Sequence, residues 1–359
     1  MEREIVRNRV WLVRKELCRR GVDCLVVTKG ANVRYLTGFS GDDSWAVVGR
    51  RSVYLLTDSR YTEQAQCECL WCRIIERHEP LAKAVGIVLG RMKTVATVGV
   101  ESWTSLAEFG ALKKAIRGRV KSVCNVIEPL RVIKDAEEIG AIRGALRIAR
   151  DAFGRIGGYL ETGVSENSLA GAFDFEIRKL GGANSFDTIV AFGSHGSRAH
   201  HQPGRRRLKK NDTVLIDFGV RYKGYCCDLT RCFSVGKRRS FYEKVYKVVQ
   251  ESQSAAIKAV RAGVAIADVE LAAKEVIGNS GLEVYGHGTG HGLGLEIHEG
   301  PAVSSRGGGR LEAGMVLTIE PGVYIPGRLG VRIEDDVLVR QDGCVVLSKG
   351  CPASPFGSS

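Results

Sequence analysis

Residues 214–229 carry two aspartates whose spacing could support chemistry. Apolar residues on both sides of Lys223 predict a β-hairpin. If the hairpin turns between Tyr222 and Lys223, Asp217 lies directly opposite Asp228 on one face of the sheet. Opposed side chains are only about 4.5 to 5.5 Å apart at Cβ, so the two carboxylates repel each other unless a proton or a cation neutralises them.

A second acidic pair repeats this arrangement, beginning 103 residues after Asp217. Glu320 and Glu334 face each other if the chain turns at Gly327. Arg332 stands two residues before Glu334, so it lies on the same face and could orient one carboxylate. Like-charge pairs of this kind are typical either of acid/base dyads with one raised pKa or of metal sites.

The histidines favour the metal site. Six of the seven lie between residues 195 and 298, and the glycine-rich segment 285–301 holds His287, His291 and His298 on a tight loop. Two divalent cations would neutralise four carboxylates, and oxygen-rich ligation with one imidazole suits manganese, cobalt or iron better than a thiolate zinc site. Two such ions about 3.5 to 4 Å apart activate water, which predicts metal-assisted hydrolysis.

Other hydrolase motifs are missing from the sequence. His298-Glu299 is not followed by the second histidine of a His-Glu-x-x-His motif, and no Gly-x-Ser-x-Gly is present. His200 and His201 precede the first acidic hairpin, and either could reach the same cleft.

An internal repeat must position these residues. Six residues recur 103 positions later: Leu208, Ile216, Asp217, Gly219, Val220 and Gly224 match Leu311, Ile319, Glu320, Gly322, Val323 and Gly327. Helical stretches begin after Gly163-Val164 and Gly263-Val264 and end at Gly181 and Gly281. The repeat predicts two half-domains, each made of helices and a hairpin.

A separate domain precedes the repeat. Short apolar runs at residues 24–27, 46–48 and 53–56, with a helical stretch near 106–116, predict an α/β domain. Asp135 and Glu138 form a capping box that begins a long helix. We therefore expect domains at residues 1–133 and 134–359.

The composition of the 359 residues excludes several classes of protein. The net charge of +13 comes mostly from residues 1–133, but the basic runs at 205–210 and 237–239 contain no aromatic residues to stack bases, so solvated loops rather than a nucleic-acid site are expected. No apolar run approaches the length of about 18 residues needed to span a membrane.

The cysteines and the N-terminus predict a cytoplasmic protein. Eleven cysteines, including the adjacent Cys226 and Cys227, do not resemble a secreted disulfide framework, and residues 1–4 are too acidic for a signal peptide. Cys67, Cys69 and Cys72 lack the second paired spacing of a zinc site.

Five motifs together resemble the Xaa-Pro peptidases, aminopeptidase P and prolidase, of the pita-bread metallopeptidase family. They are Ile-Asp-Phe-Gly at 216–219, Asp-Leu-Thr-Arg at 228–231, the histidine segment at 290–299, Thr-Ile-Glu-Pro-Gly at 318–322 and Arg-Ile-Glu-Asp-Asp at 332–336. Residues 32–39 and 56–61 look like the family's creatinase-type N-terminal domain. The resemblance implies a creatinase-like α/β domain followed by a pita-bread α+β domain with a pseudo-two-fold repeat and a mostly antiparallel, curved sheet.

The resemblance also implies roles for individual residues. The family's metal ligands fall on Asp217, Asp228, His291, Glu320 and Glu334, with Asp228 and Glu334 bridging two divalent ions, manganese first and cobalt, zinc or iron as alternatives. Glu320 would also shuttle the proton of the attacking water. His200 and His298 would steady the substrate carbonyl, His287 would line the proline side, and Arg332 would contact the substrate region.

The sequence departs from the family pattern at one position, and several alternative functions are open. Ala199 stands where the family usually has proline, which leaves open whether His200 or His201 faces the site. The predicted activity is Xaa-Pro aminopeptidase on proline-containing peptides, with Xaa-Pro dipeptidase as the alternative, in a homodimer. Methionine aminopeptidases lack the N-terminal domain, and creatinase does not use these ligands. A metal-free binding module of the same fold is the alternative from a different class.

Overall fold

The computed structural model describes residues 3–92, 95–237 and 240–356. Arg238 and Arg239, from the predicted basic loop, lie outside the described residues. The chain divides into two compact units, Met1–Arg131 and Val132–Ser359. In the part of the chain that the structure describes, every helix is too short or too polar to cross a membrane.

The first unit is built on a six-stranded mixed sheet, with strand order β4-β3-β2-β1-β5-β6. The strands are β1 (Cys24–Val27), β2 (Trp45–Gly49), β3 (Val53–Thr57), β4 (Arg73–Glu76), β5 (Thr97–Glu101) and β6 (Arg119–Val123). The helices are α1 (Arg3–Arg19), α2 (Gly30–Thr37), α3 (Thr62–Glu68), α4 (Leu81–Gly90), α5 (Leu106–Ala115) and α6 (Glu128–Val132). This arrangement confirms the predicted α/β architecture of the N-terminal part.

The second unit contains four long helices and a set of antiparallel strands. The helices are α7 (Ala136–Ile156), α8 (Glu166–Lys179), α9 (Ser240–Ala259) and α10 (Ile266–Asn279), with short 3-10 turns η1 (Gly157–Tyr159) and η2 (Gly193–Ser197). The strands of its first half are β7 (Ala183–Asn184), β8 (Ile189–Phe192), β9 (Thr213–Phe218), β10 (Val220–Tyr222), β11 (Tyr225–Cys226) and β12 (Leu229–Ser234). Those of its second half are β13 (Gly290–Gly292), β14 (Glu299–Val303), β15 (Val316–Ile319), β16 (Gly322–Ile325), β17 (Leu329–Arg332), β18 (Asp335–Arg340) and β19 (Gly343–Val346).

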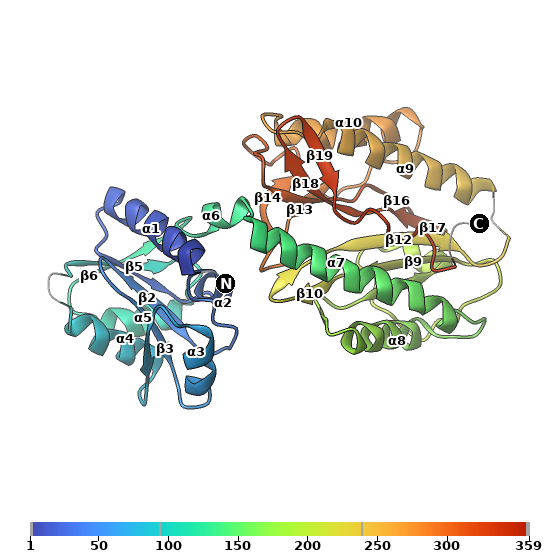
Figure 1. Ribbon diagram of the computed structural model, residues 1–359. Coiled ribbons are helices and arrows are strands. Elements are labelled where there is room, and N and C mark those ends of the chain that lie inside the picture. Colours follow the sequence, from blue (N-terminus) through green and yellow to red (C-terminus); the bar gives the residue numbers. More distant parts are fainter. Residues whose placement is uncertain (1–2, 93–94, 238–239, 357–359) are drawn as a thin grey trace. The chain divides into compact units, whose positions relative to one another are not determined.

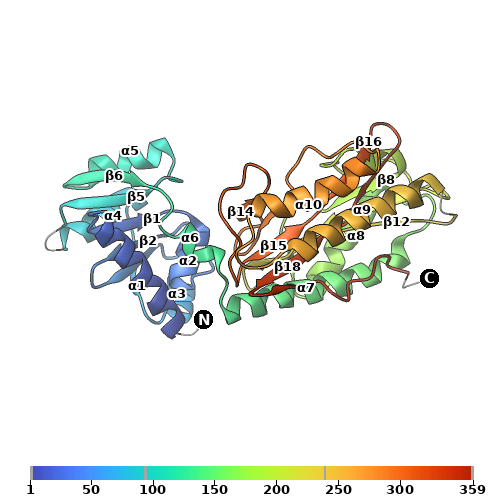
Figure 2. The same cartoon turned by 90° about the horizontal axis from the view of Figure 1, so that it is seen from above.

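The strands of the second unit lie between two pairs of helices. Figure 1 shows α7 and α8 on one side of the strands and α9 and α10 on the other. Helices α9 and α10 lie side by side in both views (Figures 1 and 2). The strand pairs described here are all antiparallel, as predicted for a pita-bread domain.

The internal repeat is confirmed by matching backbone hydrogen bonds. The amide of Gly163 donates to the carbonyl of Leu208 at 2.9 Å, and that of Gly263 donates to Leu311 at 2.8 Å. Helices α8 and α10, which follow the two glycines, each contain 14 residues. The two halves therefore have the same backbone frame, in agreement with the sequence repeat.

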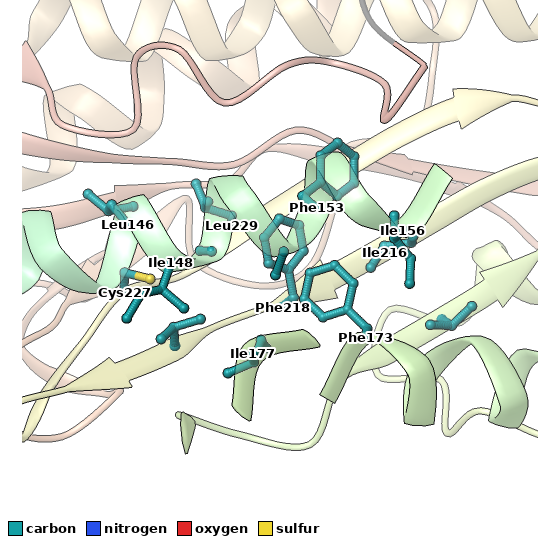
Figure 3. Packing of buried hydrophobic residues seen from close by; sticks show 14 of the residues in the cluster. Leu146, Ile148, Phe153, Ile156, Phe173, Ile177, Ile216, Phe218, Cys227 and Leu229 are labelled. Atoms are coloured by element: carbon teal, nitrogen blue, oxygen red, sulfur yellow. The ribbon is translucent and has the colours of Figure 1, made fainter. Parts of the chain in front are cut away.

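The core of the first half fixes the direction of β9. Helix α7 begins at the predicted capping box, in which Asp135 and Glu138 bond each other's backbone amides. Figure 3 shows Phe218 of β9 between Phe153 of α7 and Phe173 of α8. The ring centroids of Phe153 and Phe173 lie 5.3 and 4.7 Å from that of Phe218. Because side chains alternate along a strand, Phe218 in this core turns the neighbouring Asp217 toward the opposite face.

Candidate metal centre

One cavity of about 380 Å³ in the second unit is lined by every side chain to which the family resemblance assigned a role. These residues are His200, Asp217, Asp228, His287, His291, His298, Glu320, Arg332 and Glu334. We refer to Asp217, Asp228, His291, Glu320 and Glu334 as the ligand cluster. Its members come from both halves of the repeat.

The first hairpin has a different register from the predicted one. Asp217 pairs with Thr230 rather than with Asp228, because the chain turns at Lys223 and Gly224. Both residues have positive φ, 49° and 87°, as a two-residue type I′ turn requires. The predicted turn was centred one residue too early. This error shifts the cross-strand partner of Asp217 by two positions. Because side chains alternate along a strand, Asp228 is on the same face as Thr230 and lies diagonal to Asp217.

The second hairpin has the predicted register. Gly322 pairs with Arg332, and Ile319 pairs with Asp335, so the same alignment continues on both sides of the two glutamates. Glu320 and Glu334 lie in the short gap between these paired strands. The prediction that these two carboxylates converge is confirmed.

Burial and mutual repulsion perturb the acids of the ligand cluster. Asp228 and Glu334 are 5% and 2% exposed. Burial, followed by the charges of the neighbouring carboxylates, raises the pKa of both groups well above the usual range. Burial also raises the pKa of Glu320 to about 7, although Arg332 opposes this shift. Without a cation the ionised cluster is therefore unfavourable.

The donor atoms present fit a divalent metal. The Oδ1 atoms of Asp217 and Asp228 are buried and have no hydrogen-bond partner among the described residues. One ligand atom each from Asp228, His291 and Glu334 lies within 4.8 Å of the others. Buried, unpartnered carboxylate oxygens are costly unless they coordinate an ion, so the cluster has the chemistry of a cation site.

His291 has the tautomer that a metal ligand needs. Its Nδ1 lies 3.0 Å from the carbonyl oxygen of Gly292, which makes Nδ1 the donor and leaves the Nε2 lone pair for a cation. Nε2 lies 3.6 Å from both Asp228 Oδ2 and Glu320 Oε1. Burial lowers the pKa of His291 to about 4, so the ring is neutral near pH 7.

Arg332 joins the two halves of the repeat. Its Nη2 donates to Asp217 Oδ2 at 2.6 Å, and its Nε donates to Thr230 Oγ1 at 3.0 Å. Thr230 in turn donates to Glu334 Oε2 at 2.6 Å. The guanidinium is 3% exposed and orients one carboxylate directly and a second one through the threonine.

The remaining cavity histidines lie around the ligand cluster. The ring of His298 is 4.4 Å from that of His291, and His287 Nε2 lies 3.1 Å from the hydroxyl of Tyr324. His200 lines the cavity. His201 is buried elsewhere, with Nε2 2.9 Å from Glu166 Oε2, so of the two adjacent histidines it is His200 that faces the ligand cluster.

Three supporting residues were missed by the sequence reasoning. They are Thr230, Tyr324, whose hydroxyl accepts from Arg332 Nη1 at 2.8 Å, and Asp336, which accepts from the amide of Asp228 at 3.2 Å. Thr230 and Asp336 each follow a cluster carboxylate by two positions, so strand alternation could have indicated them.

Comparisons with known proteins show the family to which the chain belongs. The sequence model described as "Metallopeptidase family M24" matches residues 140–341, and that of the "Creatinase/Prolidase N-terminal domain" matches residues 9–133. The uncharacterized peptidase YqhT of Bacillus subtilis is 35% identical over 334 residues, covering 90% of this chain and 92% of its own.

Two solved structures extend the likeness to the whole fold. An Xaa-Pro dipeptidase from Bacillus anthracis is 32% identical with a TM-score of 0.92, covering 96% of this chain and 98% of its own. An X-Pro aminopeptidase from Thermotoga maritima is 33% identical with a TM-score of 0.86, covering 92% and 96%. Structures with both specificities are therefore similar to this chain.

Proposed function

Because the chain belongs to metallopeptidase family M24, we propose that it hydrolyses the bond between an N-terminal residue and a following proline. The observation that carries this proposal is the convergence of five candidate ligand side chains, three of them buried, from both halves of the repeat in one cavity. A metal-free binding module would not need buried carboxylates with unpartnered oxygens, since these lower the stability of an empty site.

In this proposal Asp217, Asp228, His291, Glu320 and Glu334 would together hold two divalent cations. Manganese is the expected metal, since four carboxylates and one imidazole form an oxygen-rich site. When bound, such ions balance the carboxylate charge, polarise the scissile carbonyl and lower the pKa of a water so that it can attack.

The side chains of this chain supply the proton transfer and the positioning. Glu320 accepts the proton of the attacking water and passes it to the leaving proline nitrogen. His298 and His200 donate hydrogen bonds to the carbonyl oxygen as its negative charge develops.

On the product side, His287 contacts the proline ring and is held by its bonds to the Gly288 carbonyl and to Tyr324. Burial lowers the pKa of His287 to about 4, which keeps it uncharged beside an apolar ring. Arg332 orients Asp217 and contacts the substrate region.

The proposed substrates are Xaa-Pro-Yaa tripeptides and longer peptides, so the activity is that of an aminopeptidase. The second candidate is an Xaa-Pro dipeptidase, favoured by the TM-score of 0.92 with the Bacillus anthracis enzyme. The two activities differ in whether the chain may continue beyond proline.

Parallel assays separate the two activities. Purified, chelator-treated protein is reloaded with Mn²⁺ and given Ala-Pro, Ala-Pro-Ala and, as a control, Ala-Ala-Ala. Release of alanine from Ala-Pro-Ala supports the aminopeptidase, release from Ala-Pro alone supports the dipeptidase, and inactivity on both overturns the proposed function.

A further inference from the structure

A second group of histidines lies away from the ligand cluster, around Glu166 at the start of α8. His195 Nδ1 is 2.9 and 3.1 Å from the two carboxylate oxygens of Glu166, and His201 Nε2 is 2.9 Å from one of them. The imidazole centroids are 4.6 Å apart. One ligand atom from each of the three residues lies within 4.8 Å of the others. We call these three residues the Glu166 trio.

The carboxylate of the trio is buried and held in place by the backbone. Glu166 is 0% exposed, and its oxygens accept from the amides of Phe192 at 2.9 Å and Gly204 at 3.1 Å. Burial by itself raises the pKa of Glu166, but hydrogen bonds from His201 and the two amides outweigh it and leave the pKa lowered. The trio therefore presents an oriented, anionic oxygen between two imidazoles.

The other half of the repeat shows that the fold does not need this carboxylate. The amide of Glu166 donates to the carbonyl of Arg206 at 3.0 Å, and the amide of Ile266 makes the equivalent bond to Gly309 at 3.2 Å. Ile266 is 2% exposed and packs in an apolar core at that position. An aliphatic side chain fills the equivalent place in the second half. The fold alone therefore does not explain why the first half has a buried carboxylate with two histidines around it.

We propose that Glu166, His195 and His201 bind a divalent transition-metal ion of the zinc class, separate from the ligand cluster. Two imidazoles and one carboxylate are a donor set that suits zinc and leaves one coordination position open. Bonds of about 2.0 to 2.1 Å in a tetrahedral site place ligand atoms about 3.3 Å apart. The observed N···O distances of 2.9 to 3.1 Å need only a small outward movement.

The surroundings of the trio allow an ion to enter. The side chain of His195 is 26% exposed, which gives the open position access to water, whereas that of His201 is 6% exposed. The nearby guanidinium of Arg206 lies 3.3 Å from Asp212, and this carboxylate offsets its charge. The bound ion would tie η2 and the segment that carries His200 to the N-terminal turn of α8.

Metal titration tests the proposal in the full chain. Asp228→Asn and Glu334→Gln are combined to disable the ligand cluster, and the chelator-treated protein is titrated with Zn²⁺ and, for spectroscopy, with Co²⁺. We expect one equivalent to bind, with the visible d–d absorption of a tetrahedral Co²⁺ site. Adding His195→Ala or His201→Asn should weaken this binding at least about tenfold.

The matched control removes an exposed histidine elsewhere. His78 lies in the first unit and is exposed, so His78→Ala in the same background should leave the equivalent of Zn²⁺ in place. Thermal melting of each variant checks that it is folded. The proposal is overturned if the folded double variant binds no Zn²⁺ at micromolar concentration, or if Zn²⁺ binding is unchanged after both trio histidines are replaced. Because the ligand cluster is disabled throughout, neither result bears on the proposed peptidase activity.

Discussion

The two halves of the repeat have the same backbone frame but contribute different chemistry. The first hairpin supplies two short acids, Asp217 and Asp228, at diagonal positions. The second supplies two longer acids, Glu320 and Glu334, at opposed positions, together with the only histidine of the ligand cluster. The repeat therefore brings two acidic hairpins to one cavity, while the length of the acidic side chains and the register of the strands differ between the halves.

The largest expected effect comes from removing a ligand contributed by the first half. Asp228→Asn keeps the shape of the side chain but removes its charge and one of its two carboxylate oxygens, so we expect the hydrolysis rate to fall at least about a thousandfold, with loss of bound metal. Steady-state assays with Mn²⁺ and elemental analysis of the purified protein measure both quantities.

A matched control for this substitution lies in the same half. Asp187 is exposed and follows Phe186, which lines the cavity, so Asp187→Asn should keep metal content and rate near wild type. Full activity and metal content in Asp228→Asn would show that Asp228 is not a metal ligand.

The link between the halves can be broken at Arg332. Arg332→Met leaves the buried Asp217 without its 2.6 Å partner, so the free energy of unfolding should fall by about 3 kcal/mol. Urea denaturation of the metal-free protein measures the change. Arg328→Met, at the exposed tip of the same hairpin, removes a contact of the guanidinium with the Phe241 ring, so the free energy of unfolding should change by less than about 1 kcal/mol. Equal effects of the two substitutions would contradict a bridging role for Arg332.

The stability of the metal-free protein should depend on pH through Glu320. Its pKa is raised from 4.5 to about 7 in the folded state, so the folded state binds the extra proton between these values. The contribution of Glu320 to the free energy of unfolding should then fall as pH rises from about 5 to 7, by on the order of 1 kcal/mol per pH unit. Thermal melts across this range test the sign.

Two comparisons sharpen the pH test. Glu320→Gln should remove this part of the decline, and saturating Mn²⁺ should reverse it, because the cation replaces the proton. If the metal-free Glu320→Gln variant showed the same pH dependence as the metal-free wild type, Glu320 would not be the group responsible.

The smallest expected effect is a change in stability at the turn of the first hairpin. Lys223 has a φ of 49°, a conformation that asparagine tolerates better than lysine, and type I′ turns favour Asn-Gly. Lys223→Asn should raise the free energy of unfolding by about 0.5 kcal/mol. Lys210→Asn provides an exposed control without a positive φ. Destabilisation by Lys223→Asn would argue against this turn and its register.

Much of the fold and the cavity could be predicted because the same residue types recur at a fixed spacing in the two halves of the repeat. The second hairpin has a glycine at its centre, and its register was predicted correctly. In the first hairpin the turn includes Lys223, whose positive φ no side-chain preference indicates. Because the resulting error moved the partner of Asp217 by two positions, the two aspartates were still placed on the correct face of the sheet.

The rest of the site depends on contacts between distant strands. Thr230 reaches Glu334 across the two halves, and Tyr324 lies between Arg332 and His287. Such contacts follow from how the hairpins pack, which the spacing along one strand does not encode. The Glu166 trio was not predicted for the same reason, since its residues come from α8, from η2 and from the segment after η2.

The central claim is that the ligand cluster holds two divalent ions between acids from both halves. Anomalous diffraction from crystals soaked in Mn²⁺ tests this claim most directly. We predict two peaks in the cavity, about 3.5 to 4 Å apart, each within coordination distance of both Asp228 and Glu334. A single peak, or peaks bound by the residues of one half alone, would contradict it.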